Sequence, residues 1–424
     1  MVSKQLKVFL SGRVAGTLTQ GGNGQLTFHY EERYEGTSLS IAMPVSNRTY
    51  GDSIVRPFLF GVLPDDIRVR KSLGAEVGAP ANNPFALLEH VGLDCPGTVQ
   101  FCNECNVADA LDRPDELLPL DAAEIARRLR MGRQQDGSSW ICHQEHWSLG
   151  GQQSKFALRW ENSCWNSCLG SAASTHIFKC GISSLQLQAL NEFMSLKLTG
   201  ACGIPTANVS YQLFEDEPSI IIERYDRTRD HEGRVVRLHQ EDVCQALGVL
   251  PDNKYADHGG PSTPQVIDLL KRTGTAAQQN IGLLLPCSSS TTSSGHPTPT
   301  RRITHYCSMG HNLHALHPFM NVASILPYID SRERVRLAMG IGGENRLGRV
   351  GSGAIKKFVE QEELEALGFT HEACCRLMAE LAQSIPVHLQ RLFVDKAAIP
   401  HIKELEERFL HPVTQVCETT LGLL

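Results

Sequence analysis

The chain has 424 residues, of which 41% are hydrophobic and 20% charged, and its formal net charge is −6. This length and composition predict a globular protein of two or three domains with a sizeable core. The negative net charge argues against a protein that binds nucleic acid by itself, so any contact with DNA would come through a basic partner. No apolar stretch reaches the length of a signal peptide or a membrane helix, which predicts a cytoplasmic location and no membrane partner.

The first hundred residues have the alternating pattern of short strands. Residues 6–30 alternate, with a strand over 6–10, a turn at Gly12-Arg13 and a Gly-rich turn at 21–24 before residues 26–30, and residues 39–45 give another short strand. The turn residues 94–97 close this β-rich part. We therefore expect a small β-rich domain over residues 1–105.

Two further features of this half concern the core and the connection to the rest of the chain. The apolar strings 57–60 and 63–64 suit either a core or an interface, and we expect the core because apolar strings are usually buried. Residues 121–133 have the composition and spacing of a helix. This predicts a helical connection over residues 106–146.

The cysteines do not form a disulfide scaffold in so long a chain, although there are fourteen of them. Cys102 and Cys105 form a CxxC pair, and Cys164 and Cys168 form a CxxxC pair. Neither has a second pair at the spacing of a zinc finger, so we expect reduced, structural thiols.

From residue 147 the pattern changes. The periodicity predicts a strand, a glycine turn and a strand over 147–160, a short strand over 174–179, a helix over 185–198, a hairpin over 209–214 and 220–225, and mostly helices over 330–412. This order fits a two-lobed α+β protein whose lobes span 147–260 and 261–424.

The first lobe offers residues in the order that a protein kinase needs. A kinase requires a glycine-bearing loop over the phosphates, a strand lysine, a helix glutamate that holds this lysine, a base aspartate, and an asparagine and an aspartate for magnesium. The chain has the loop residues 148–155, then Lys179 at the end of a strand, then Glu192 in the next helix. Residues 223–226 follow a buried strand, where a hinge would offer backbone hydrogen bonds to adenine.

Each of these features has an ordinary alternative: a hairpin turn for the glycines, a solvated strand-end lysine, a solvated helix glutamate and a strand-end ion pair. The ordered set favours a kinase more than any single member does.

Longer strings carry a resemblance to a known family. The strings are GGQQSKFAL, STHIFK, the pair Asn191-Glu192, IIERYDR, LHQEDVCQALG and KYADHGGPS, with DCPGTVQF before them and LAMGIGGEN after them. In order and spacing, they resemble the HipA family of serine/threonine-protein kinase toxins. The resemblance covers nearly the whole chain. It implies a two-lobed protein-kinase-like fold with a small N-terminal β-rich domain and a mostly helical C-terminal lobe.

The resemblance also implies an activity and partners. Members are toxins of toxin–antitoxin pairs that use ATP and Mg²⁺, autophosphorylate, and bind a helix-turn-helix antitoxin (HipB-like) that in turn binds operator DNA. Their protein substrates are thought to be translation components.

The same resemblance assigns site residues. The phosphate loop would consist of Gly150, Gly151, Gln152, Gln153, Ser154 and Lys155. Lys179 would contact the phosphates, paired with Glu192, and Glu223, Arg224 and Tyr225 would line the adenine site. Ser148 matches the serine that the family autophosphorylates, which ejects this loop and switches the kinase off; a plain turn serine is the alternative.

One segment departs from the family pattern. Residues 269–329 contain no Asp or Glu, although acidic residues occupy 46 of the 424 positions. The family's catalytic loop, D-x-H-x-K-N, and its later Tyr-Asp magnesium ligand belong here, but the composition is that of a linker. Three explanations compete: a Ser/Thr-rich insert in a pseudokinase, a metal site of His311, His314 and His317, and a stretch of about 280–321 translated out of frame.

The genetic code favours the third explanation. Read out of register from the junction Ser290/Thr291, the codons allow N-Y-L-I-G-A, then Pro or Ser, then D-A-H-A-K-N-Y-S-L-L. The catalytic Asp then arises across Pro297/Thr298 and the metal-binding Asn across Arg302/Ile303, while the family's Thr before the Asp is unreachable. Removing one base near Met320-Asn321 likewise allows L-Y-D-V, which supplies the metal-binding Asp and rejoins the normal frame.

The physical consequence concerns the reaction. Without the base Asp and the magnesium ligands, the chain itself should have little or no kinase activity. The alternative function is that of a non-catalytic pseudokinase that acts as an antitoxin-binding corepressor. We also expect residues 270–320 to be poorly packed.

Overall fold

A computed structural model describes most of the chain. The described residues are 3–103, 107, 110, 115–134, 145–151, 153–254, 260–283, 305–308, 314–316, 320–329 and 335–424, of which 275, 305–308, 314–316, 338 and 339 are described by their backbone alone. They fold into two compact units. The first comprises Met1–Ser183, Gln212–Lys254 and His305–His314, and the second comprises Ser184–Tyr211, Tyr255–Thr304 and Ala315–Leu424.

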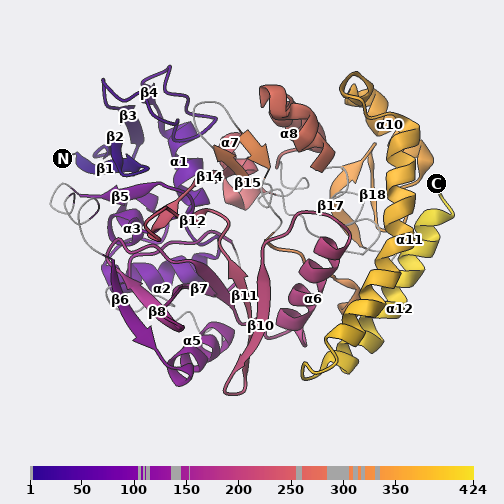
Figure 1. Cartoon of the computed structure of the whole chain (residues 1–424). Coiled ribbons are helices and arrows are strands. Elements are labelled where there is room, and N and C mark those ends of the chain that lie inside the picture. The colour runs from indigo at the N-terminus through magenta and orange to yellow at the C-terminus, as the bar shows by residue number, and fades with distance from the viewer. Residues whose placement is uncertain are drawn as a thin grey trace. The chain divides into compact units, whose positions relative to one another are not determined.

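The first unit begins with a five-stranded sheet in the order β4-β3-β2-β1-β5 (Figure 1). Its strands are β1 (Lys4–Leu10), β2 (Arg13–Gln20), β3 (Leu26–Tyr30), β4 (Thr49–Tyr50) and β5 (Gln100–Cys102). Ser11 and Gly12 both have positive φ between β1 and β2, as a two-residue hairpin turn requires. The alternation thus predicted the first three strands correctly, but the strand expected over 39–45 is wrong, because these residues form only an isolated bridge between Ser40 and Met43.

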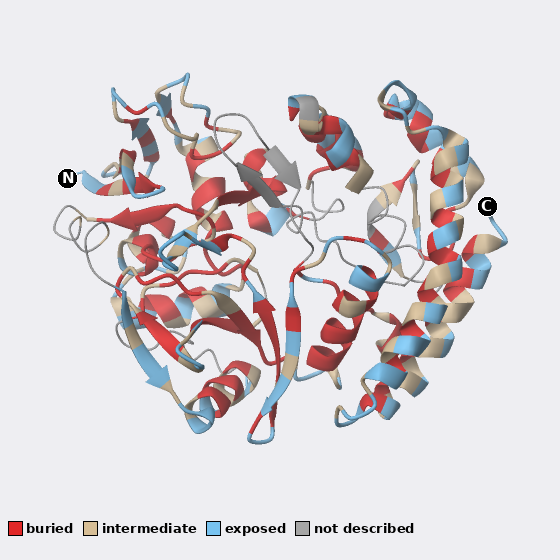
Figure 2. Ribbon diagram, in the orientation of Figure 1, coloured by how far each residue is buried: buried red, intermediate tan, exposed pale blue. Residues whose placement is uncertain are grey.

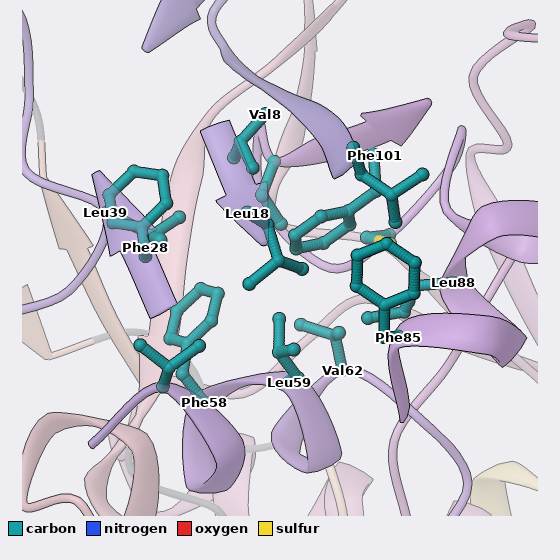
Figure 3. Close-up of a cluster of buried hydrophobic side chains, with 14 of the residues drawn as sticks. Val8, Leu18, Phe28, Leu39, Phe58, Leu59, Val62, Phe85, Leu88 and Phe101 are labelled. Atoms are coloured by element: carbon teal, nitrogen blue, oxygen red, sulfur yellow. The ribbon is translucent and has the colours of Figure 1, made fainter. Parts of the chain in front are cut away.

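Three helices, which the alternation did not predict, complete this N-terminal layer: α1 (Asp52–Gly61), α2 (Ile67–Val77) and α3 (Pro84–Val91). Figure 3 shows Phe58, Leu59 and Val62 directed from the α1 end toward Leu18 and Phe28 of the sheet. The apolar string 57–60 therefore contributes to the core, as expected.

The second sheet of the unit has the order β10-β11-β9-β7-β8-β6. Its strands are β6 (Glu116–Leu120), β7 (Lys155–Glu161), β8 (Cys164–Leu169), β9 (His176–Lys179), β10 (Val209–Phe214) and β11 (Glu217–Glu223), and α5 (Ala122–Gln134) lies beside them (Figure 1). The expected helix at 121–133, the strand at 174–179 and the hairpin of β10 and β11 are confirmed. The strand expected before the glycine turn at 150–151 is wrong, because residues 147–151 form only isolated bridges.

Short elements follow β11 along the chain. They are β12 (Arg227–Arg229), β13 (Val235–Arg237), β14 (His239–Asp242), α7 (Val243–Ala246), β15 (His305–Ser308) and β16 (His314–Leu316), of which β14, β15 and β16 form one sheet. Cys102, Cys164 and Cys168 are free thiols, as expected, whereas Cys105 lies outside the described residues.

The second unit is mostly helical. It contains α6 (Gln188–Ala201), α8 (Thr263–Lys271), α10 (Ser352–Gln361), α11 (His371–Asp395), α12 (Ile402–Leu421) and the strands β17 (Arg336–Ile341) and β18 (Glu344–Arg346). Met378, Leu381 and Ile385 of α11 are buried, and Figure 2 shows buried stretches along this helix. The helical prediction holds for α10 to α12 and is wrong at β17 and β18. No described helix is long and apolar enough to cross a membrane.

Candidate functional site

Two buried lysines face each other across neighbouring strands of the second sheet. Lys155 of β7 is the register partner of Lys179 of β9, and their exposed fractions are 8% and 3%. Side chains of directly opposed residues project from the same face of a sheet. Lysine is almost never fully buried unless an anion or polar groups accompany it. This face therefore gathers two positive charges, and the solvated strand-end alternative for Lys179 is wrong.

The same face carries an apolar strip beside the lysines. Ala157 pairs with Ile177, and Ile177 pairs with Ile222, so the three side chains lie in one row across β7, β9 and β11. All three are buried. A strip of small and branched side chains next to two cations suits a ligand with an apolar ring and an anionic tail.

Helix α5 lies on the opposite face of the sheet. The Arg128 guanidinium of α5 lies 5.9 Å from the ring of Phe156, whose side chain points away from the Lys155 face. A Cβ atom on Gly132 of α5 would approach Ser154 and Cys180, which also belong to that opposite face. Of the two faces, the described helix α5 thus covers the one without lysines.

The glycine loop, residues 148–155, closes over Lys155. The Lys155 Nζ donates a hydrogen bond to the Gly150 carbonyl at 2.9 Å. Gly151 has a φ of 108°, and a Cβ atom there would lie 2.7 Å from this Nζ. The positive φ favours glycine, and a Cβ atom there would force the Lys155 Nζ to move. Of the remaining predicted loop residues, Gln153 and Ser154 are half-buried and Gln152 lies outside the described residues.

Ser148 is buried rather than placed in an exposed turn. Its exposed fraction is 1%, and its Oγ donates to the Val62 carbonyl at 2.6 Å. Its backbone N–H donates to the Asp94 carbonyl at 3.0 Å. The hydroxyl is therefore withdrawn from solvent in this structure, and its role as the site of autophosphorylation stays a prediction.

In the segment at the end of β11, the side chains of Arg224 and Tyr225 bind neighbouring residues. Arg224 forms a buried ion pair with Asp226 at 2.9 Å, and the Tyr225 hydroxyl donates to Gln240 at 2.8 Å. Glu223 is exposed and pairs in register with His176, whose pKa burial lowers to about 4. The ion pair suggested by the sequence is present, as part of a larger network.

That network joins two aspartates and three arginines inside the first unit. Asp94 binds Arg227 at 2.9 Å and Arg237 at 3.0 Å, and Asp226 accepts from Arg224 and from the Gly97 N–H. Burial alone would raise the pKa of Asp94 and of Asp226, but the arginines outweigh it and hold both well below their usual range. Sequence reasoning missed this role of Asp94, although the string DCPGTVQF that contains it was visible.

In the second unit, α6 buries Glu192, whose exposed fraction is 2%. Gln188 Nε2 donates to Glu192 Oε2 at 3.3 Å. The alternative of a solvated glutamate is therefore wrong. Pairing between Glu192 and Lys179 stays a prediction.

Most of the segment 280–321 lies outside the described residues, including the positions Pro297, Thr298, Arg302 and Ile303. Most of residues 270–320, which were expected to be poorly packed, are likewise not described. Where the segment ends, Met320 is buried and Asn321 exposed. In the described part of the chain, no group of three or more His, Cys, Asp or Glu could hold a metal ion. The proposed histidine site includes His311 and His317, which are not described.

The fold and this face define an α+β protein with a small N-terminal domain and a kinase-like remainder. Family models match both parts: the HipA N-terminal domain over residues 6–102 and the HipA-like C-terminal domain over residues 147–389. The chain belongs to the HipA family of kinases.

Relatives and a solved structure agree. The Sinorhizobium fredii protein Y4mE, which is named as a kinase, is 34% identical over 293 residues, which cover 67% of this chain and 69% of that protein. The serine/threonine-protein kinase toxin HipA of Shewanella oneidensis is 30% identical over 241 residues, covering 55% of this chain and 52% of that protein. The structure of Shewanella oneidensis HipA in complex with HipB and operator DNA matches with a TM-score of 0.82 at 23% identity. The match covers 99% of this chain and 98% of that one. This similarity confirms the predicted fold class.

Proposed function

We propose that this chain is, by descent, an ATP-dependent protein serine/threonine kinase of a toxin–antitoxin module, and that it binds ATP but transfers phosphate poorly or not at all. The observation that carries the proposal is the pair of opposed, buried lysines, Lys155 and Lys179, under a glycine loop that contacts Lys155. The second half of the proposal rests on the absence of Asp and Glu from residues 269–329.

The proposed roles follow from the chemistry of the residues. Two ammonium groups and the amides of Gly150 to Lys155 suit phosphate oxygens, and the strip of Ala157, Ile177 and Ile222 suits the adenine ring. Adenine contacts from residues 223–225 would use backbone groups, because the side chains of Arg224 and Tyr225 bind elsewhere. Glu192 would hold Lys179, and Ser148 would be the site of autophosphorylation.

Magnesium fits this chain poorly. Mg²⁺ is held in kinases by carboxylate and amide oxygens that neutralise charge on the transferring phosphoryl group. Residues 269–329 supply no carboxylate for this purpose. We propose that an intact catalytic loop, encoded in the alternative reading frame, would transfer the γ-phosphate of ATP to a serine of a translation component.

The nucleotide half of the proposal predicts the effect of Lys179→Met. Loss of one charge-assisted contact to phosphate, worth roughly 1.5–3 kcal/mol, should weaken the binding of a fluorescent ATP analogue about 10- to 100-fold. The exposed lysine Lys71 offers a matched control, Lys71→Met, which should leave the Kd unchanged. Equal affinities for the wild type and Lys179→Met, at equal melting temperatures, would contradict the proposed site.

A second function, that of a non-catalytic corepressor, is favoured by one observation. The core of the N-terminal domain is fully formed in a chain that lacks the catalytic acids. In this case the chain would bind a HipB-like antitoxin in the cytoplasm and reach operator DNA through it. The gene sequence over codons 280–322 separates the two functions, because a one-base slip at each end favours the damaged kinase and a clean in-frame insert favours the corepressor.

A further inference from the structure

The segment that leads into the glycine loop is held by Asp94 of the N-terminal domain through backbone hydrogen bonds. The Asp94 N–H donates to the His146 carbonyl at 3.2 Å, and the Ser148 N–H donates to the Asp94 carbonyl at 3.0 Å. These two bonds form a parallel bridge between Asp94 and Trp147. The position of Ser148 is therefore tied to the backbone of Asp94.

A second stretch of the N-terminal domain holds the loop from the other end. The Asp65 N–H donates to the Gly151 carbonyl at 3.1 Å, and the Ser148 Oγ donates to the Val62 carbonyl at 2.6 Å. Asp65 is fixed in turn by a buried ion pair with Lys254 at 3.0 Å. Contacts from residues 62–65 and from Asp94 thus reach both ends of residues 148–151.

The carboxylate of Asp94 points into the sheet that carries the lysines. Its Oδ2 accepts from both the N–H and the Oγ of Ser174, at 3.1 and 2.6 Å, and its Oδ1 accepts from Arg227 at 2.9 Å and Arg237 at 3.0 Å. Ser174 lies two residues before β9, the strand of Lys179, and Arg227 begins β12, which follows β11 along the chain. Asp94 therefore connects the glycine loop, through its backbone, to the segment that enters β9 and to the strands that follow β11, through its side chain.

Stability alone gives a weak reason for such a network. A buried ion pair is often no more stabilising than apolar residues of the same volume, but it fixes geometry because each charge demands a partner in a defined place. Asp94, with an exposed fraction of 1%, has partners on three separate segments. A network of this kind suits a site that must hold a loop and a lysine strand in register.

We infer that Asp94 is a positioning residue for the nucleotide site, and that its contacts are the latch that keeps residues 146–151 folded over Lys155. This inference rests on the proposed function for its link to ATP. The latch itself does not, since it concerns only contacts within the first unit. Release of Ser148 requires its N–H bond to Asp94 and its Oγ bond to Val62 to break.

The test is Asp94→Asn in the full-length chain, studied by amide hydrogen exchange and by titration with a fluorescent ATP analogue. The amide keeps the size of the side chain but removes the negative charge that Arg227 and Arg237 bind. We expect exchange of the Ser148 and Asp65 amides to rise at least tenfold and the Kd to rise about tenfold. Asp226→Asn is the matched control, because Asp226 is equally buried and binds Arg224 and Arg227 but has no contact with residues 146–151 among its described hydrogen bonds.

The outcomes separate the inference from the proposed function. Unchanged exchange of residues 146–151 in Asp94→Asn, or an equal rise in Asp226→Asn, would overturn the latch. Faster exchange in Asp94→Asn alone, with no nucleotide binding by the wild type, would support the latch and overturn the proposed function. If Asp94→Asn does not fold, Arg237→Gln removes one partner at the edge of the network and should give a smaller rise in the same amides.

Discussion

Two adjacent carboxyl groups, those of Glu241 and Asp242, lie buried in β14. Glu241 accepts hydrogen bonds from Ser40 Oγ at 2.6 Å and from the Ile41 N–H at 2.7 Å, so it joins β14 to a loop of the N-terminal domain. Asp242 caps α7 through the Gln245 N–H. Burial raises the pKa of both groups to about 7, against the hydrogen bonds that lower it.

This shift predicts how stability depends on pH. An unfolded glutamate releases its proton near pH 4.5, but folded Glu241 keeps its proton up to about pH 7. Between these values the folded state binds more protons, so its stability falls as pH rises and stays lower above pH 7. Glu241→Gln removes this loss. The difference in free energy of unfolding between the variant and the wild type should therefore be more favourable to the variant at pH 8.5 than at pH 5, by on the order of 1–3 kcal/mol.

The measurement is the difference in melting temperature between Glu241→Gln and the wild type at the two pH values. The exposed Glu32→Gln serves as the control and should show the same difference at both. A gain for Glu241→Gln that is larger at pH 5 than at pH 8.5 would refute the assignment of a raised pKa.

At the scale of elements, Gly151 shows how the glycine loop depends on its backbone. Its φ of 108° disfavours any side chain, and an added Cβ would collide with the Lys155 Nζ. Gly151→Ala should therefore displace Lys155 and weaken nucleotide binding about tenfold or more. Gly203→Ala is the control, because Gly203 has a φ of 78° but open space around it. Equal nucleotide affinities in the two variants would show that loop strain is unimportant.

The elements also show what the sequence could predict. β1 to β3 were predictable because one buried face imposes a period of two, and α6 and α11 because their apolar residues recur at helical spacing. Helix α1 was missed because the apolar string 57–60 is continuous and carries no period. The strand expected before the glycine turn was wrong because the real partners of this segment, Asp94 and residues 62–65, are distant in sequence.

The candidate site, too, was only partly predictable from the sequence. The order of glycine loop, Lys179 and Glu192 was readable from the sequence, because each residue type is tied to phosphate chemistry. The burial of Lys155, Lys179 and Ser148 was not, because it is set by register and by contacts across the first unit. The role of Asp94 was hidden for the same reason.

At the scale of the molecule, the chain combines matches to two HipA-family domain models with a segment that contains no Asp or Glu. Family models cover residues 6–102 and 147–389, and that second range includes the acid-free residues 269–329. The proposed out-of-frame translation would explain how one segment can differ while the sequence on both sides keeps the family pattern. In that case ATP binding, which uses residues before this segment, should survive the loss of phosphotransfer.

The most direct test is incubation of the full-length chain with ATP and Mg²⁺, followed by mass spectrometry of the peptide that contains Ser148, on protein shown by titration to bind the nucleotide. A chain with residues 280–321 restored to the other reading frame serves as the positive control. We predict saturable ATP binding and no phosphate on Ser148 in the chain as it stands, and phosphate on Ser148 in the restored chain. Phosphorylated Ser148 in the unaltered chain would contradict the account, since it would require a carboxylate elsewhere in the sequence to serve the phosphoryl group.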